Sequence, residues 1–129
     1  MSRKIKEEAG SGASTRALMA GETMRRALAG IFTRTQWRDE ALRGKIITVA
    51  EVRVAPDFSA ARAYVMPLLG EGAAEVVEAL NRCKSYIKRE AARELKFRIM
   101  PDLLFVADDS FERGAAIERA LAAVIPPPA

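Results

Sequence analysis

Histidine is absent from the 129-residue chain, and cysteine occurs once, at Cys83. Without histidine the chain cannot build a Ser-His-Asp or Cys-His nucleophile, or a metal site that uses imidazole ligands. A single cysteine cannot form an internal disulfide or a thiolate metal cluster, which is typical of proteins in a reducing cytosol. We therefore expect a binding protein rather than an enzyme, with no catalytic residue, no metal and no other cofactor.

Long hydrophobic runs are also lacking. The longest, such as residues 103–107, fall far short of the roughly 20 apolar residues that a membrane helix needs. The charged first eight residues have no apolar stretch behind them, so they do not resemble a secretory signal. We expect a cytoplasmic protein that has neither a membrane contact nor a small-molecule substrate.

What the chain does contain is typical of one folded domain. Half of the residues are hydrophobic and 29% are charged, a composition that excludes a disordered protein. Residues 1–14 are polar and rich in Gly and Ser, which predicts a mobile N-terminal arm. Residues 126–128 are prolines and predict a short extended tail over 125–129. The expected domain therefore covers 15–124.

Hydrophobic periodicity predicts an α+β domain. We expect a helix over 16–33 capped by Ser14 or Thr15, and an antiparallel hairpin of strands 46–55 and 61–68. A long helical segment over 73–95, a third strand at 103–107 and a last helix over 111–124 complete the order. Helices should cover one face of a three-stranded sheet.

Two apolar patterns define the predicted core. One face of the first helix carries Ala20, Met24, Ala27, Leu28, Ile31 and Phe32. In the first strand, strict alternation places Ile47 and Val49 on one face, and Val52 and Val54 on the other.

The segment 73–95 predicts a break. Apolar residues recur at helical spacing on one face: Val76, Leu80, Cys83, Ile87 and Ala91. A continuous helix would place Lys84 on that apolar face, so we expect the helix to break or kink near residues 83–85.

The net charge of +4 conceals an alternation along the sequence. Residues 1–45 carry +5, 46–80 carry −3, 81–100 carry +5 and 101–129 carry −3. On a continuous helix, with a turn of about 100° per residue, four basic side chains would lie within about 60° of one another around the helix axis. This basic stripe consists of Arg82, Arg89, Arg93 and Lys96.

This basic stripe has two interpretations. It could be a solvated face, the usual role of charge runs. Only Glu90 and Glu94 are available to balance seven cations, and the break exposes a helix N-terminus, so we favour phosphate binding. A secondary basic surface on the first helix consists of Arg16, Arg26 and Arg34.

Several segments, in order, resemble the ribosome-binding factor A family. They are residues 49–57 (VAEVRVAPD), 61–65 (ARAYV), 79–82 (ALNR), 87–90 (IKRE), 95–98 (LKFR) and 101–105 (PDLLF), followed by Asp109-Ser110. The resemblance extends from about Arg16 to Leu121. It implies a type II KH-like fold, α-β-β-α-kink-α-β-α, in which a helix-kink-helix unit packs on the sheet.

The resemblance also implies a role in ribosome biogenesis. It points to a monomer that binds the 30S subunit and its 16S rRNA in late maturation, assists rRNA processing at the 5′ end and serves cold adaptation. The KH loop GXXG is absent, and the family's Ala-x-Gly kink corresponds to Cys83, Lys84 and Ser85. Recognition of folded rRNA through phosphates and shape is expected. The candidate RNA-binding residues are Arg82, Lys84, Ser85, Lys88, Arg89, Arg93 and Lys96.

Other interpretations remain open at this point. A cytoplasmic protein-protein interaction module without RNA contact is the main alternative, and a carboxylate-based hydrolase is the weakest. Cys83 is interpreted as a core thiol rather than a nucleophile, and the acids at 108–109 as helix caps rather than metal ligands. Trp37, Phe58 and Tyr86 either cover the core edge or stack on bases.

Overall fold

The structure, a computed structural model, describes residues 12–108. Its elements are α1 (Gly12–Arg34), β1 (Ile47–Val54), β2 (Ala60–Pro67), the 3-10 turn η1 (Leu68–Gly70), α2 (Ala73–Arg82), α3 (Lys84–Glu94) and β3 (Asp102–Ala107). Helix α1 begins at Gly12, so the predicted start near residue 16 and the cap at Ser14 or Thr15 were wrong. The predicted arm up to residue 11, the last helix, the Pro-rich tail and the Asp109 cap lie outside the described residues.

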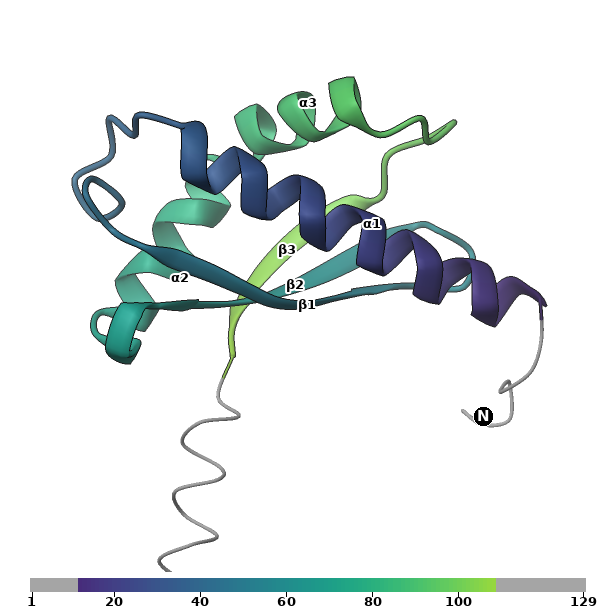
Figure 1. Cartoon of the computed structure of the whole chain (residues 1–129), viewed down its shortest axis with the longest axis horizontal. Helices are drawn as coiled ribbons and strands as arrows, with labels where there is room; N and C mark the ends of the chain where they lie inside the picture. Colours follow the sequence, from purple (N-terminus) through teal and green to yellow (C-terminus); the bar gives the residue numbers. More distant parts are fainter. Residues whose placement is uncertain (1–11, 109–129) are drawn as a thin grey trace, which may run out of the picture.

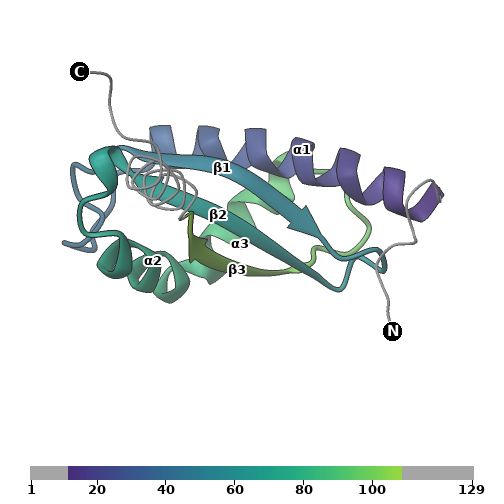
Figure 2. The same ribbon diagram turned by 90° about the horizontal axis from the view of Figure 1, so that it is seen from below.

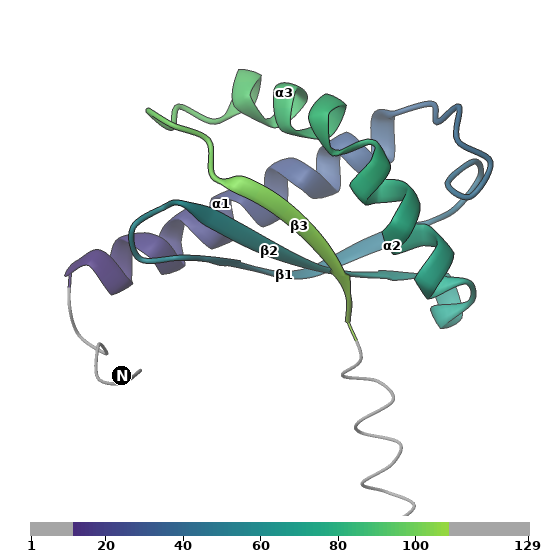
Figure 3. The ribbon, with the colours of Figure 1, turned by 180° about the vertical axis from the view of Figure 1, so that it is seen from behind.

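One three-stranded sheet forms the floor of the domain (Figure 1). Strands β1 and β2 pair antiparallel, as the hairpin prediction required, and β3 pairs parallel to β2 on its other side. Because parallel neighbours need a crossover, α2 and α3 connect β2 to β3. Helices α1 and α3 cover one face of the sheet, while α2 packs beside β3 (Figures 2 and 3). The α+β class is confirmed.

The core lies between α1, the kinked helix pair and the sheet. All six residues of the predicted α1 face are buried. Val76, Leu80, Ile87 and Ala91 of the helix pair are buried too, and Cys83 is half-buried against them. The helical periodicity of both segments therefore identified the core side correctly.

The alternation predicted for β1 was wrong. Val49 and Val52 are both buried, and Ile47 and Val54 are half-buried on the core side. A register shift between Val49 and Glu51 explains this, because the extra residue of a β-bulge moves the following side chains to the opposite face. The bulge therefore lets these four apolar side chains of β1, the pair before it and the pair after it, face the same core.

Gly21 fixes how closely α1 approaches the sheet. A Cβ atom at this position would lie 2.3 Å from the carbonyl oxygen of Val52 in β1. The helix can therefore rest on the strand backbone only where the side chain is a hydrogen atom. This explains a helical glycine whose low propensity counts against it in the sequence.

Asn81 occupies the free edge of β3. Its Nδ2 donates to the carbonyl of Phe105 at 3.0 Å, and the Phe105 N–H donates to its Oδ1 at 3.0 Å. The side-chain amide thus takes the place of a neighbouring strand and satisfies backbone groups beside a buried phenyl ring. It also anchors the end of α2, immediately before the kink.

Candidate nucleic-acid interface

The break predicted near residues 83–85 is confirmed at Cys83. This residue has φ −95° and ψ 9°, and it separates α2 from α3. Its N–H donates to the carbonyls of Ala79 and Leu80, so α2 is hydrogen-bonded up to the break. The conformation is open to any L-residue, and Ser85 lies within α3, so the kink needs no glycine. This accounts for a kink built from Cys-Lys-Ser rather than Ala-x-Gly.

The kink and the end of α1 enclose a hollow of about 660 Å³, which we call the kink groove. Its walls come from the last residue of α1, the loop that follows and both sides of the break. The lining residues are Arg34, Thr35, Gln36, Trp37, Arg38, Asp39, Arg82, Cys83, Ser85, Tyr86 and Arg89. The groove therefore joins the first and third blocks of the charge alternation, which lie far apart in the sequence.

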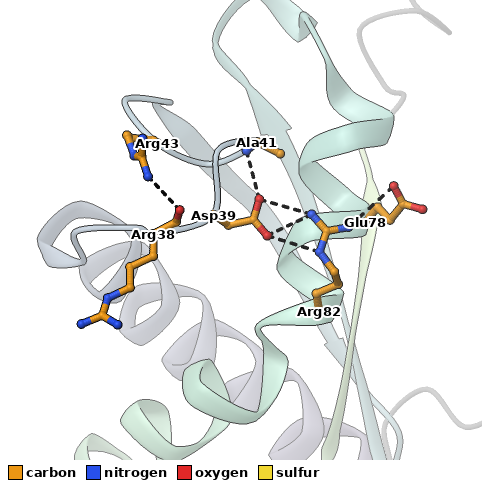
Figure 4. Close-up of polar contacts among 6 residues, drawn as sticks. All are labelled: Arg38, Asp39, Ala41, Arg43, Glu78 and Arg82. Atoms are coloured by element: carbon orange, nitrogen blue, oxygen red, sulfur yellow. Dashed lines mark hydrogen bonds and ion pairs between the residues drawn. The ribbon is translucent and has the colours of Figure 1, made fainter.

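Two of the four arginines in the groove are held by carboxylates. The Arg82 Nη2 atom lies 2.9 Å from the Asp39 Oδ2 atom, and Nε also donates to this oxygen, at 3.2 Å (Figure 4). The Ala41 N–H donates to the same carboxylate at 3.0 Å. Arg34 bridges to Glu94 at 2.6 Å and to Glu90 at 3.6 Å. These pairs hold the loop and α1 against the kink.

The charge pairing is visible in the pKa of Asp39. The Arg82 guanidinium, followed by the Ala41 N–H, holds the pKa of this carboxyl below its ordinary value of 3.8. Asp39 therefore stays ionised at neutral pH and keeps Arg82 oriented. Because Arg82 already donates to a carboxylate, it positions the groove more than it offers a free charge.

The other two arginines, Arg38 and Arg89, have no ion pair within residues 12–108. The Arg38 carbonyl accepts a hydrogen bond from Arg43 at 2.9 Å, which fixes the backbone while the side chain points away from the Asp39–Arg82 pair (Figure 4). The Arg89 guanidinium lies 5.9 Å from the ring centroid of Tyr86. These two cations are available to a ligand.

Two aromatic side chains, Trp37 and Tyr86, also line the groove. Trp37 contacts Phe32 edge-on at 5.9 Å and Tyr86 at 6.5 Å between ring centroids. Trp37 thus covers the edge of the core, the first of the two roles considered for it. Tyr86 is 36% exposed, and its hydroxyl lies 3.5 Å from that of Thr35. An exposed ring beside a guanidinium can stack on a base.

The structure separates the residues of the predicted stripe. Arg82 precedes the break and Lys96 follows the end of α3, so only Arg89 and Arg93 share a helix. Of the candidate RNA-binding residues, Arg82, Ser85 and Arg89 line the kink groove. Arg93 lies 3.8 Å from Glu90, on α3.

The remaining candidates lie elsewhere. Lys88 pairs with Asp102 at 3.1 Å, at the start of β3. Lys84 lines a separate hollow of about 410 Å³ beside Arg53 and Arg62 of the hairpin strands. Lys96 lies at the far end of α3.

The secondary basic surface is likewise divided along α1. Arg34 joins the kink groove, Arg26 faces Glu22 at 3.9 Å, and Arg16 lies near the opposite end of the helix. Sequence reasoning missed Arg38 altogether. Its signal was its place in the first basic block, four residues after Arg34.

Three further observations concern metal ligands, the single thiol and the length of the helices in the described part of the chain. Residues 12–108 hold no group of three or more acidic or cysteine side chains that could bind a metal ion. Burial is the main cause that raises the pKa of the Cys83 thiol, which disfavours the reactive thiolate. None of the described helices is long and apolar enough to cross a membrane.

Comparison with known proteins decides the family. The family model for "Ribosome-binding factor A" matches residues 16–121 of this chain. The chain belongs to the ribosome-binding factor A family. It is 42% identical over 118 residues to the ribosome-binding factor A of Methylocella silvestris, covering 92% of this chain and 76% of the relative. The chain is also 38% identical over 121 residues to the ribosome-binding factor A of Nitrobacter winogradskyi, a match that covers 94% of this chain and 88% of the relative.

Solved structures of the family share the fold. The crystal structure of ribosome-binding factor A from Thermus thermophilus superposes with a TM-score of 0.59 at 25% identity, covering 70% of this chain and 93% of the other. A homology model of the Thermus protein, fitted into a cryo-EM map of its complex with the 30S subunit, gives a TM-score of 0.54 at 27% identity. The match covers 69% of this chain and 91% of the other. Membership of the family establishes a ribosome-binding factor with a type II KH-like fold.

Proposed function

We propose that this protein binds the 30S ribosomal subunit and contacts 16S rRNA through the kink groove. The observation that carries the proposal is that Arg38 and Arg89, which have no ion pair within residues 12–108, line the same groove as the exposed Tyr86 ring. Support for the partner comes from the relatives, which are named ribosome-binding factors, and from the Thermus protein fitted into a 30S complex.

The chemistry of the groove favours RNA over an apolar partner. Free guanidinium groups bind phosphate oxygens in a bidentate manner. These electrostatic contacts with the phosphate backbone make nucleic-acid affinity strong and salt-dependent. Helix α3 begins at Lys84, and its N-cap residue, Cys83, makes no side-chain capping hydrogen bond. The N–H groups of its first turn and its macrodipole therefore add to the positive potential. Tyr86 supplies a face for one unstacked base. Three kinds of RNA contact thus converge in one groove.

Arg38 and seven of the candidate residues receive a role in this proposal. Arg38, Ser85 and Arg89 contact the RNA, while Arg82 and Arg34 hold the groove in shape. Lys84, Lys88 and Arg93 lie on neighbouring surfaces of the helix pair and attract the phosphate backbone at longer range.

The finer function follows the family resemblance. We infer that the protein acts in the cytoplasm as a monomer, during late maturation of the 30S subunit. There it assists processing of the 16S rRNA 5′ end by holding one arrangement of the rRNA. Its action is binding, without catalysis, and it supports growth in the cold.

Co-sedimentation with purified bacterial 30S subunits tests the proposal. The variant Arg38→Gln/Arg89→Gln removes the two free cations and should lose at least about tenfold in affinity at low salt. Its melting temperature should stay unchanged, because neither side chain has an ion pair among the described residues. The matched control, Lys45→Gln/Arg62→Gln, removes the same charge outside the groove and should bind like the wild type.

The same gradients separate RNA from protein recognition. For RNA binding, the affinity should fall steeply as salt rises, and nuclease treatment of the subunits should abolish it. Binding that survives both treatments would instead support the protein-protein interaction module. Equal binding by the groove variant and the control would show that the kink groove is not the contact surface.

A further inference from the structure

A second basic hollow, of about 530 Å³, lies at the opposite end of α1 from the kink groove. Three segments build it: the first turns of α1, the turn between β1 and β2, and the chain that follows α3. Figure 1 shows these three segments at the same end of the domain, and residues from all three line the hollow. We call it the hairpin hollow.

The hairpin hollow holds three free cations. Arg16, Lys96 and Arg98 come from two separate segments, and none of them has an ion pair or hydrogen-bond partner within residues 12–108. The one acid among its lining residues, Asp57, is engaged within its own turn. Its carboxylate accepts hydrogen bonds from the Ser59 N–H at 3.0 Å and from the hydroxyl at 2.7 Å. The hollow therefore has a positive charge, and its three cations have no carboxylate partner within residues 12–108.

Two aromatic rings meet at the same place. Phe58 has φ 62°, in the left-handed region that a non-glycine residue rarely occupies. Its N–H donates to the Ala55 carbonyl at 2.8 Å, which holds this conformation. The Phe58 ring contacts Phe97 edge-on, with 6.1 Å between centroids. Such strain is often found at binding sites, and nearby Ile99 is 73% exposed.

We propose that the hairpin hollow is a second RNA contact, in addition to the kink groove, and this proposal rests on the proposed function. Arg16, Lys96 and Arg98 bind backbone phosphates, and an unstacked base lies against the Phe58–Phe97 pair. Unpaired cations beside aromatic rings suit the alternation of phosphate and base along a nucleic-acid strand.

The spacing of the two contacts defines the RNA that would fit. Arg16 and Arg34 lie about 27 Å apart along α1, from their sequence separation and a rise of about 1.5 Å per residue. A stacked strand advances by roughly 3.4 Å per nucleotide, so on the order of eight nucleotides separate the two contacts. Engaging both ends of one helix on the same rRNA raises affinity through effective concentration.

The test compares the affinities of several variants for two probes, purified 30S subunits and protein-free 16S rRNA. Lys96→Gln/Arg98→Gln should weaken binding to both by roughly tenfold. Losing two phosphate contacts should also make the slope of log affinity against log salt shallower by roughly 1.4 to 1.8. The control Lys45→Gln/Arg62→Gln should change neither quantity.

A second variant, Phe58→Gly, separates binding from folding. Glycine accepts the positive φ at this position, and this relief offsets part of the lost contact with Phe97, so the protein should still fold with only a small change in melting temperature. Loss of the ring should still weaken RNA binding about fivefold or more. A purely structural role for Phe58 would leave RNA affinity unchanged.

Each remaining outcome overturns a different statement. If the Lys96/Arg98 variant binds like the wild type while Arg38→Gln/Arg89→Gln fails, the second contact is wrong and the proposed function stands. If the Lys96/Arg98 variant loses affinity for 30S subunits but not for 16S rRNA, its partner is a ribosomal protein and the RNA assignment is wrong. If the wild-type protein binds neither probe, both proposals are wrong.

Discussion

Replacing Gly21 with alanine tests the contact that places α1 on the sheet. The added Cβ would lie 2.3 Å from the Val52 carbonyl oxygen, whereas ordinary contact begins near 3.4 Å. The helix and strand must therefore separate by about 1 Å. Overpacking of this kind costs about 1–3 kcal/mol, and the better helix propensity of alanine returns about 1 kcal/mol. We expect Gly21→Ala to lower the free energy of unfolding by about 1 kcal/mol.

Gly30→Ala is the matched control on the same helix. Gly30 is exposed, and the nearest atom to its added Cβ is the mobile end of Arg34, at 3.7 Å. Only the propensity gain applies there, so this variant should be more stable by about 0.5–1 kcal/mol. Because both variants share the propensity gain, their difference isolates the cost of the close approach.

Urea unfolding followed by circular dichroism measures both variants against the wild type. A difference of about 1 kcal/mol corresponds to a shift of roughly 4 °C or more in the melting temperature of a domain this size. The reasoning is refuted if the two alanine variants shift stability by the same amount in the same direction. That result would mean that α1 does not rest on the β1 backbone at Gly21.

Three further predictions concern the kink and its supports. Asn81→Ala leaves the buried Phe105 backbone groups unpaired and should cost about 1–3 kcal/mol in urea unfolding; a neutral result would refute the edge-capping role. The folded-state pKa of Asp39 is lowered, so its pairing with Arg82 stabilises above the ordinary value of 3.8 and is lost as pH falls through the lowered pKa. The melting temperatures of wild type and Asp39→Asn should therefore converge in acid; a gap that stays constant would contradict the ion pair. Burial raises the pKa of the Cys83 thiol, so iodoacetamide should modify it more slowly than free cysteine at neutral pH, as followed by mass spectrometry.

The order of the described elements could be predicted because each depends on local chemistry. The helical repeat identified the buried face of α1, and the misplaced Lys84 located the break at Cys83. Both signals arise from a period of 3.6 residues within one segment. The β1 alternation failed because a bulge is set by pairing with β2, which a single strand does not reveal.

The candidate site was less predictable than the fold. A helical wheel combined Arg82, Arg89 and Lys96 into one stripe, although a break and a helix end separate them. Arg38 was missed because its importance depends on the loop that the Arg82–Asp39 pair holds against the kink. Charge along a sequence shows how many cations exist, but not which of them find a carboxylate.

By itself, the sequence determined that this is a histidine-free, basic α+β protein with a broken helix and a family resemblance. Composition and periodicity are properties of single segments, so they can be read from the sequence without knowing how the segments pack. Only the tertiary structure decided which cations stay free. Folding pairs Arg34 and Arg82 with carboxylates from other segments, whereas Arg38 and Arg89 have no ion pair within residues 12–108 and line the same groove as Tyr86. These pairings join residues distant in the chain, and their geometry exists only once α1, its loop and the kinked helices are packed together.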